Sequence, residues 1–260
     1  MESTVYHLAL NADATAGATL ALLPGDPGRV EALARSAPLT GARELANKRE
    51  FRTWLAYLGD VPVLVTSTGI GGPSTSIVID ELAQLGVRTF LRVGTTGAIQ
   101  PDISVGTVIV TTGAVRLDGA STHYAPIEYP AVAHHDVVAA AIGAARALDI
   151  PCRAGVSASC DTFYPGQERY DSYSGYVPRR FQGATDEWRR LHVLNYEMEA
   201  STVLTLTAAM GLRGGCVAGV ILNRATGESV SAADHARGES NVVRVATAAI
   251  AVLAREAGRP

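Results

Sequence analysis

The sequence predicts an α/β fold: a single-domain, three-layer sandwich in which a mixed central sheet is flanked by helices. Short apolar runs typical of strands alternate along the chain with longer helix-like stretches, the order expected when helices cover both faces of a sheet. The chain has 260 residues, of which 47% are hydrophobic, enough for one substantial core. No internal repeat, low-complexity segment or linker divides it. We therefore expect one domain over residues 1–260.

Strand-like and helix-like segments follow one another along the chain. The predicted strands are short apolar runs at residues 20–23, 61–67, 87–93, 107–111, 153–159 and 216–222. The predicted helices lie at residues 74–85, 137–148, 200–210 and 241–257, and another begins at 30–34. The charged segment 43–52 is predicted to be helix-like with a solvated face. In such folds ligands bind where the carboxyl ends of strands meet loops.

Composition excludes several classes of protein. The formal net charge is −3 and no block of Lys or Arg occurs, so neither nucleic acid nor an anionic membrane is expected as a partner. The first residues lack the pattern of a signal peptide, and Arg213 interrupts the longest apolar run, residues 203–222. Cys152, Cys160 and Cys216 have no CxxC spacing. We expect them to be inert core thiols in a reducing cytoplasm.

Arg92 stands near the end of an apolar run and is followed by Gly94-Thr95-Thr96-Gly97. A buried charge needs a partner, so an arginine at a strand end facing a Gly/Thr loop indicates an anion site. Glycine lets the backbone approach a ligand, and threonine offers hydroxyl and amide donors. The alternative is a structural arginine that caps a turn by bonding to carbonyl oxygens.

A second loop of this kind, Pro24-Gly25-Asp26-Pro27-Gly28-Arg29, follows the first predicted strand. Its prolines fix the turn and its glycines permit positive φ. Arg29 would lie near the amino end of the next helix, where free N–H groups and the helix dipole favour an anion. Neither loop matches GxxxxGK(S/T) or GxGxxG. The two arginines therefore predict a small free anion, phosphate, rather than a nucleotide tail.

A third Gly-rich loop, residues 67–74, leads into a predicted helix. It could hold phosphate on its backbone amides, or it could be a tight turn with Ser74 as the helix N-cap. The structural interpretation is favoured because no arginine or lysine accompanies the loop.

The segment after the fifth predicted strand combines the ring of Phe163, the amide of Gln167 and the guanidinium of Arg169. Gln offers one acceptor and two donors, and Arg offers donors only. Together with a stacking ring they can recognise the edge of uracil. The alternative is a solvated loop with aromatic anchors.

Glu197 and Glu199 flank Met198. On a strand, residues two apart share a face, so this pair could perform general acid/base chemistry. A glycosidase pair is not favoured, because glycoside hydrolysis by two carboxylates needs no anion-binding arginines.

Together, these motifs resemble the nucleoside phosphorylase-I family. The segments that carry the resemblance are LPGDP at 23–27, STGIGGPS at 67–74, RVGTTG at 92–97 and FYPGQERY at 163–170. The last is specific to the uridine branch of the family. The resemblance runs in consistent order from His7 to Arg224, and the tail from Thr226 carries less of it.

The resemblance implies a role for each matching residue. The phosphate-binding positions are Gly25, Arg29, Arg92 and Thr95, with Arg49 delivered by a neighbouring subunit. The ribose positions are Thr95, Met198 and Glu199, with His7 of a neighbouring subunit reaching the 5′-hydroxyl. The uracil positions are Phe163, Gln167 and Arg169, and Arg224 lies near the base. Arg92, Glu199 and Arg224 are expected to act in catalysis, and Glu197 is expected to be structural. Glu50, Ile70 and Ser74 match positions that hold a monovalent cation, such as potassium, between subunits. On their own, His7 and Arg49 would be interpreted as surface residues.

The implied reaction is the reversible phosphorolysis of uridine to uracil and ribose 1-phosphate, in pyrimidine salvage. Inorganic phosphate would be the co-substrate, with no cofactor beyond the possible cation. The resemblance also implies a hexamer, built as a trimer of dimers, in the cytoplasm.

Three alternatives stay open: a purine nucleoside phosphorylase, a nucleosidase that uses water, and a nucleoside-binding protein without activity. Purine-specific relatives carry an aspartate after the strand that ends here at residue 222, where this chain has Asn223-Arg224. That difference favours pyrimidines, and the phosphate arginines disfavour the other two alternatives.

Overall fold

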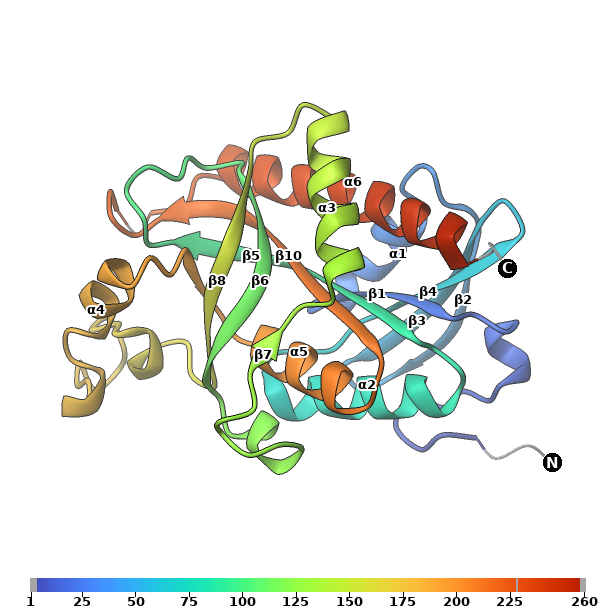
Figure 1. The fold of residues 1–260 in the computed structure, drawn as a ribbon, viewed down its shortest axis with the longest axis horizontal. Helices are drawn as coiled ribbons and strands as arrows, with labels where there is room; N and C mark the ends of the chain where they lie inside the picture. The colour runs from blue at the N-terminus through green and yellow to red at the C-terminus, as the bar shows by residue number, and fades with distance from the viewer. Residues whose placement is uncertain (1–3, 228, 258–260) are drawn as a thin grey trace.

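A mixed sheet of ten strands crosses the molecule (Figure 1). It is described in a computed structural model, which covers residues 4–227 and 229–257. The strands are β1 Leu20–Pro24, β2 Thr40–Lys48, β3 Phe51–Leu58, β4 Val61–Thr66, β5 Thr89–Ala98, β6 Val108–Leu117, β7 Ala131–Val132, β8 Cys152–Cys160, β9 Asn195–Glu197 and β10 Arg213–Asn223. Their order is β10-β6-β8-β9-β5-β1-β4-β3-β2, with β7 beside β6.

Helices cover both faces of this sheet (Figure 1). They are α1 Val30–Ala34, α2 Gly72–Gln84, α3 His135–Ala147, α4 Ala184–Arg190, α5 Ala200–Ala209 and α6 Ala232–Ala257. One apolar core packs α1, α3 and α6 against one face, through residues such as Leu33, Val137 and Val245. A second core packs α2 and α5 against the other face, through residues such as Ile79 and Leu206. The predicted three-layer α/β sandwich with a mixed sheet is confirmed.

The sheet also closes on itself, which the sequence did not indicate. β10 pairs with both β5 and β6, and β9 pairs with both β5 and β8. Because β6 and β8 are also paired, these five strands form a ring. β5 lies at the junction: its first half is parallel to β1 and its end pairs with β9. The strands β1, β9 and β10, which all pair with β5, therefore bring their residues close to the middle and the carboxyl end of β5.

The charged segment 43–52 is not helical as expected; it forms most of β2, the turn and the start of β3 in a hairpin. β2 is the edge strand of the sheet and is largely exposed. Its charges meet partners across the hairpin, as Arg52 does with Glu44 at 3.1 Å. An exposed edge strand is rich in charged residues for the same reason as a solvated helix face, so charge alone misidentified the element.

Residues 94–97 are strand rather than the expected loop, because β10 pairs with β5 along its whole length. The glycines there make space for side chains. A Cβ at Gly94 would lie 3.3 Å from Arg92 Nη2, and one at Gly97 would lie 3.0 Å from Leu222 Cδ1.

The last helix begins earlier than predicted, at Ala232. The Ser231 hydroxyl accepts a hydrogen bond from the Asp234 N–H at 3.0 Å, an N-cap that precedes the apolar pattern. Gly238 then lets α6 approach β10 closely beside Gly219, since a Cβ at either position would meet the other backbone.

The boundaries of the predicted domain, 1–260, remain a prediction, because residues 1–3, 228 and 258–260 lie outside the described residues. Within the described part of the chain, every helix is too short or too polar to cross a bilayer.

The cysteines support one prediction about pH. All three are free, and Cys160 and Cys216 are buried. Burial raises the pKa of each of these two thiols to about 12, so both stay protonated and poorly nucleophilic at pH 8. We expect neither thiol to react with iodoacetamide in the native protein at pH 8, and both to react in urea. Rapid modification of either in the native state, mapped by mass spectrometry, would contradict this.

Candidate active site

A cavity of about 990 Å³ opens where the carboxyl ends of β1, β4 and β5 meet β9 and β10. Most of the site residues predicted from the sequence line it: Gly25, Arg29, Glu50, Ile70, Ser74, Arg92, Thr95, Phe163, Gln167, Arg169, Met198 and Glu199. Loops that are distant in sequence meet here because β1, β4 and β5 run parallel and end at the same edge of the sheet. The roles of these residues remain predictions.

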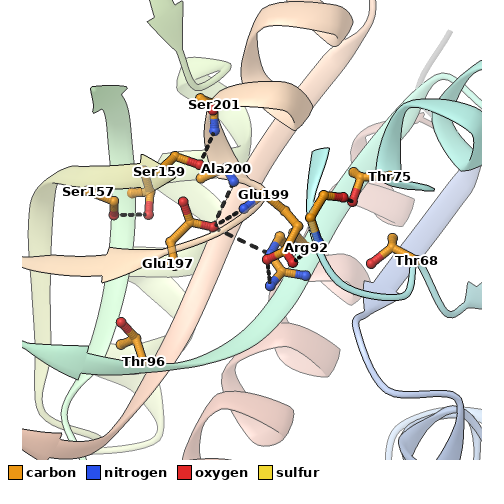
Figure 2. A network of polar contacts seen from close by, with 12 residues as sticks. Thr68, Thr75, Arg92, Thr96, Ser157, Ser159, Glu197, Glu199, Ala200 and Ser201 are labelled. Carbon is orange, nitrogen blue, oxygen red and sulfur yellow. Dashed lines mark hydrogen bonds and ion pairs between the residues drawn. The ribbon is translucent and has the colours of Figure 1, made fainter. Parts of the chain in front are cut away.

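Arg92 is a buried cation of this cavity, with a side chain only 7% exposed. Its Nη2 forms an ion pair with Glu199 Oε2, and its Nε lies 3.7 Å from Glu197 Oε2 (Figure 2). Burial disfavours the arginine charge, but the two carboxylates outweigh it and raise the pKa of Arg92. Nε and Nη1 have no hydrogen-bond partner among the described residues. The guanidinium therefore keeps donors for a bound anion.

Glu197 and Glu199 do not share a strand face, so the alternative of a paired acid and base on one strand is wrong. β9 ends at Glu197, and Glu199 is the residue before α5. Glu197 Oε2 accepts hydrogen bonds from the N–H groups of Glu199 at 2.8 Å and Ala200 at 2.7 Å (Figure 2). Burial, together with the nearby Glu199 carboxylate, raises the pKa of Glu197. Glu197 thus holds the start of α5 while Glu199 faces the cavity.

Gly25 leaves a space between two arginines. A Cβ at Gly25 would lie 3.8 Å from Arg92 Nη1 and 3.9 Å from Arg29 Nη2, so both guanidinium groups face the same point beside the backbone. Burial and the charge of Arg92 lower the pKa of Arg29, although Glu239, 3.6 Å away, opposes this. An anion between the two arginines would offset their repulsion.

The loop after β4 contributes a backbone N–H group to the site, and Ser74 does not cap the helix that follows. α2 begins at Gly72 with Gly71 as its N-cap, so the prediction that Ser74 caps the helix is wrong. The Ser74 hydroxyl instead contacts the carbonyl oxygens of Ile70 and Gly71, both at 3.3 Å. Gly71 has a φ of +91°, which favours glycine. Its N–H donates to Glu199 Oε1 at 2.6 Å and fixes that carboxylate.

The far end of the cavity presents a flat, polar wall. The Arg169 guanidinium lies over the Phe163 ring, 4.4 Å from its centroid, and Gln167 is buried beside it. Arg224 does not line the cavity; its Nη1 donates to the Gln167 carbonyl at 2.8 Å and its guanidinium lies over the Tyr196 ring. A ring, an amide and a guanidinium together suit the planar edge and face of a base.

His7 and Arg49 also lie outside the cavity of their own chain. His7 Nδ1 is 2.6 Å from Glu81 Oε1 on α2. Arg49 is exposed in the turn between β2 and β3, with a φ of +57°. The family resemblance implied that both act on a neighbouring subunit, and their positions leave that prediction open.

Two residues of the site gave no signal in the sequence. Tyr196 is buried on β9 and lines the cavity, next to the predicted pair Met198 and Glu199. Glu239 reaches Arg29 only because α6 packs back over the sheet. Proximity in sequence could have identified Tyr196, but nothing local identifies Glu239.

The set predicted to hold a cation presents oxygen atoms at the open side of the cavity. A Cβ at Gly69 would lie 2.9 Å from Glu50 Cγ and 3.2 Å from Ser74 Oγ, so these two side chains are neighbours. The Ile70 carbonyl oxygen accepts from the same Ser74 hydroxyl. Carboxylate, hydroxyl and carbonyl oxygens are suitable ligands for potassium.

Comparisons with known proteins match nearly the whole chain. A family model described as phosphorylase superfamily matches residues 19–259. A uridine phosphorylase of Escherichia coli strain K12 is 56% identical over 244 residues, covering 94% of this chain and 96% of the relative. A uridine phosphorylase of Thermococcus kodakarensis is 46% identical, with coverages of 97% and 88%. A guanosine phosphorylase of Halorubrum lacusprofundi is 38% identical over 82% of each chain.

The space beside Gly25 supports a prediction about anion binding. In Gly25→Ala the new methyl group would lie 3.8–3.9 Å from the two arginine nitrogens, where the anion is expected, and 3.3 Å from the Gly69 carbonyl oxygen. We expect orthophosphate affinity, measured by calorimetry, to fall at least about tenfold, or about 1.4 kcal/mol. The matched control is Gly143→Ala on α3, where a Cβ meets nothing within 4 Å. Equal phosphate affinity in the Gly25→Ala variant and the wild type would contradict the prediction.

Proposed function

The chain belongs to the phosphorylase superfamily, and we propose that it is a pentosyltransferase of pyrimidine salvage that converts uridine and phosphate reversibly into uracil and ribose 1-phosphate. One observation carries the proposal. A single cavity joins two arginines that face Gly25, a buried carboxylate at Glu199 and a base-sized wall at Gln167. Relatives named uridine phosphorylase, up to 56% identical over nearly the full chain, support the same substrate.

Phosphate would occupy the space beside Gly25. Arg92 and Arg29 would neutralise its charge, and the Thr95 hydroxyl, which also lines the cavity, would donate a further hydrogen bond. Phosphate is a weak nucleophile in water. Holding it against the anomeric carbon in a buried site turns a bimolecular encounter into an oriented reaction.

The ribose would lie between phosphate and base, against Met198 and Glu199, which line the middle of the cavity. As the glycosidic bond breaks, the sugar gains positive charge. The phosphate on one side and the Glu199 carboxylate at the ribose hydroxyls would stabilise that charge. Because Gly71 and Arg92 fix Glu199 before substrate binds, little reorganisation is needed.

The departing uracil gains negative charge. Gln167 and Arg169 would stabilise it by donating hydrogen bonds to its carbonyl oxygens, with Phe163 against its face. The acidic residues that line the described cavity are Asp26, Glu50, Glu197 and Glu199, and none of them belongs to the segment that carries Phe163, Gln167 and Arg169.

Asn223 also cannot donate a proton to a departing purine. It is an amide, and its Nδ2 donates to the carbonyl oxygens of Gln100 and Ile103, each at 2.8 Å. The base wall therefore supports a pyrimidine that leaves as an anion over a purine that must be protonated.

We further propose that two copies complete each site, within a hexamer built as a trimer of dimers. Glu50 lines the cavity edge of its own chain, and the exposed Arg49 directly precedes it. A two-fold axis beside this edge would place Arg49 at the cavity of the partner. By the same symmetry, the partner's turn between β2 and β3 would lie at the cavity of this chain, as in an isologous interface. His7 would reach the ribose of the neighbouring subunit in the same way.

The same edge supports a monovalent cation at Glu50, Ile70 and Ser74, whose oxygens lie near one another. When bound there, potassium would be held by the oxygens of Glu50, Ile70 and Ser74 and would supply positive charge that offsets the Glu50 carboxylate. Three free thiols support a reducing compartment, and we propose the cytoplasm.

A phosphate-dependent assay over uridine, thymidine, inosine, guanosine and adenosine tests the function. We expect uracil and ribose 1-phosphate from uridine only when phosphate is present. Arg92→Ala should lower kcat by about 10²–10³-fold, as for loss of one preorganised charge contact. Arg153→Ala, which removes an exposed arginine paired with Asp102, serves as the control. Cleavage of uridine without phosphate would identify a nucleosidase, and a preference for guanosine or inosine would identify a purine enzyme.

Mixing inactive variants tests the shared site. Arg49→Ala and Arg92→Ala chains, refolded or co-expressed together, would form mixed dimers in which one site has both arginines intact. Random pairing should restore roughly a quarter of the wild-type activity. If the mixture stays as inactive as the separate variants, Arg49 acts within its own chain; if Arg49→Ala alone keeps wild-type activity, Arg49 has no role in the site.

A further inference from the structure

Glu168 lies between the two residues proposed to recognise the base, Gln167 and Arg169, yet it does not line the cavity. Its carboxylate is turned to α4 instead. Oε1 accepts a hydrogen bond from the N–H of Gly183, and Oε2 accepts one from the N–H of Thr185 at 2.8 Å. Both carboxylate oxygens are thus held by the first backbone N–H groups of that helix.

The backbone of Glu168 is left-handed, with φ +52° and ψ +47°. A residue with a Cβ rarely adopts this conformation, and neighbouring contacts must stabilise it. Its geometric effect is to reverse the chain. As a result the residues on both sides, Gln167 and Arg169, face the cavity and are buried.

Other contacts fix the backbone on either side of this reversal. The Gln167 carbonyl accepts from Arg224 Nη1, and the Arg169 N–H donates to the carbonyl of Tyr164, each at 2.8 Å. Gly166 has no room for a side chain, because its Cβ would lie 2.6 Å from Thr162 Oγ1. The reversal at Glu168 is therefore set within a loop that has little freedom.

α4 is a firm point of attachment. The Arg189 side chain donates from Nε to the carbonyl of Ile99 at 2.8 Å, and Trp188 packs against a core that includes Tyr196. Tyr196 itself lines the cavity. A contact from Glu168 to the start of α4 thus fixes the base-recognition loop relative to the rest of the site.

We propose that Glu168 is a positioning residue for base recognition: by binding the amino end of α4 it holds Gln167 and Arg169 where they recognise the base. This inference rests on the proposed function. Glu168 does not line the cavity; it acts through the two residues beside it.

Steady-state kinetics with both substrates test the inference. Glu168→Ala should lower kcat/KM for uridine on the order of 10–100-fold, since displacement of contacts by about 1 Å has effects of that size. KM for phosphate should change less than about twofold, because Arg29 and Arg92 are untouched. Glu168→Gln keeps an oxygen acceptor and should recover part of the loss.

Two further variants separate positioning from simple destabilisation. Glu168→Gly accepts the left-handed backbone without strain but lacks the carboxylate, so it should behave like Glu168→Ala. Asp186→Ala removes an exposed acidic group from the first turn of α4 and should leave uridine kinetics unchanged. In a Gln167→Ala background, Glu168→Ala should cost clearly less than in the wild type, as coupled residues do.

Several results would overturn the inference: wild-type uridine kinetics in Glu168→Gly, equal losses for uridine and phosphate, full additivity with Gln167→Ala, or the same defect in Asp186→Ala. The proposed function is judged separately, on the wild type. If the wild type shows no phosphate-dependent cleavage of uridine, the function fails; if it does and the Glu168 variants match it, only the positioning role fails.

Discussion

The buried guanidinium of Arg92 is the constraint on which the site depends. A charge in the middle of a core strand is tolerated only with close partners, and here they are Glu197 and Glu199. Glu197 is the last residue of β9 and Glu199 directly precedes α5, so the closure of the sheet through β5 and β9 is also what neutralises the charge. Breaking such a buried pair typically costs about 3–5 kcal/mol. The carboxylates do not use every donor of Arg92. The same side chain can therefore stabilise the fold through its ion pairs and bind an anion through its remaining donors.

Parallel strands explain how the other groups reach Arg92. β1 and β4 end beside β5, so the loops that follow them lie at the same edge of the sheet. The backbone of Gly69 donates to the carbonyl of Gly25, which ties the two loops together. Small residues then leave room for a ligand where side chains would otherwise fill the edge, as at Gly25. The residues proposed to recognise the base, Phe163, Gln167 and Arg169, come from the segment that follows β8. Glu168 attaches this segment to the start of α4 through a hydrogen bond from the Thr185 N–H.

Local patterns in the sequence predicted much of this. Apolar runs located β1, β4, β5, β6, β8 and β10 but missed the buried strands β3 and β9. The motifs around Gly25, Arg92 and Gln167 identified residues that meet in one cavity. The errors arose where tertiary contacts decide. Residues 94–97 are strand because β10 extends beside them, and residues 43–52 form an edge hairpin whose charges imitate a helix. The link from Glu239 to Arg29 spans most of the chain, and no local pattern carries such information.

The central claim is that separated basic groups of this chain converge on one inorganic oxyanion next to the sugar. A crystal structure with orthophosphate and a non-cleavable uridine analogue tests it most directly. We predict a phosphate ion that contacts both Arg29 and Arg92 beside the Gly25 backbone, with the ribose hydroxyls at Glu199 and the base between Phe163 and Gln167. Density for phosphate elsewhere, or arginines that point into separate pockets, would contradict the account.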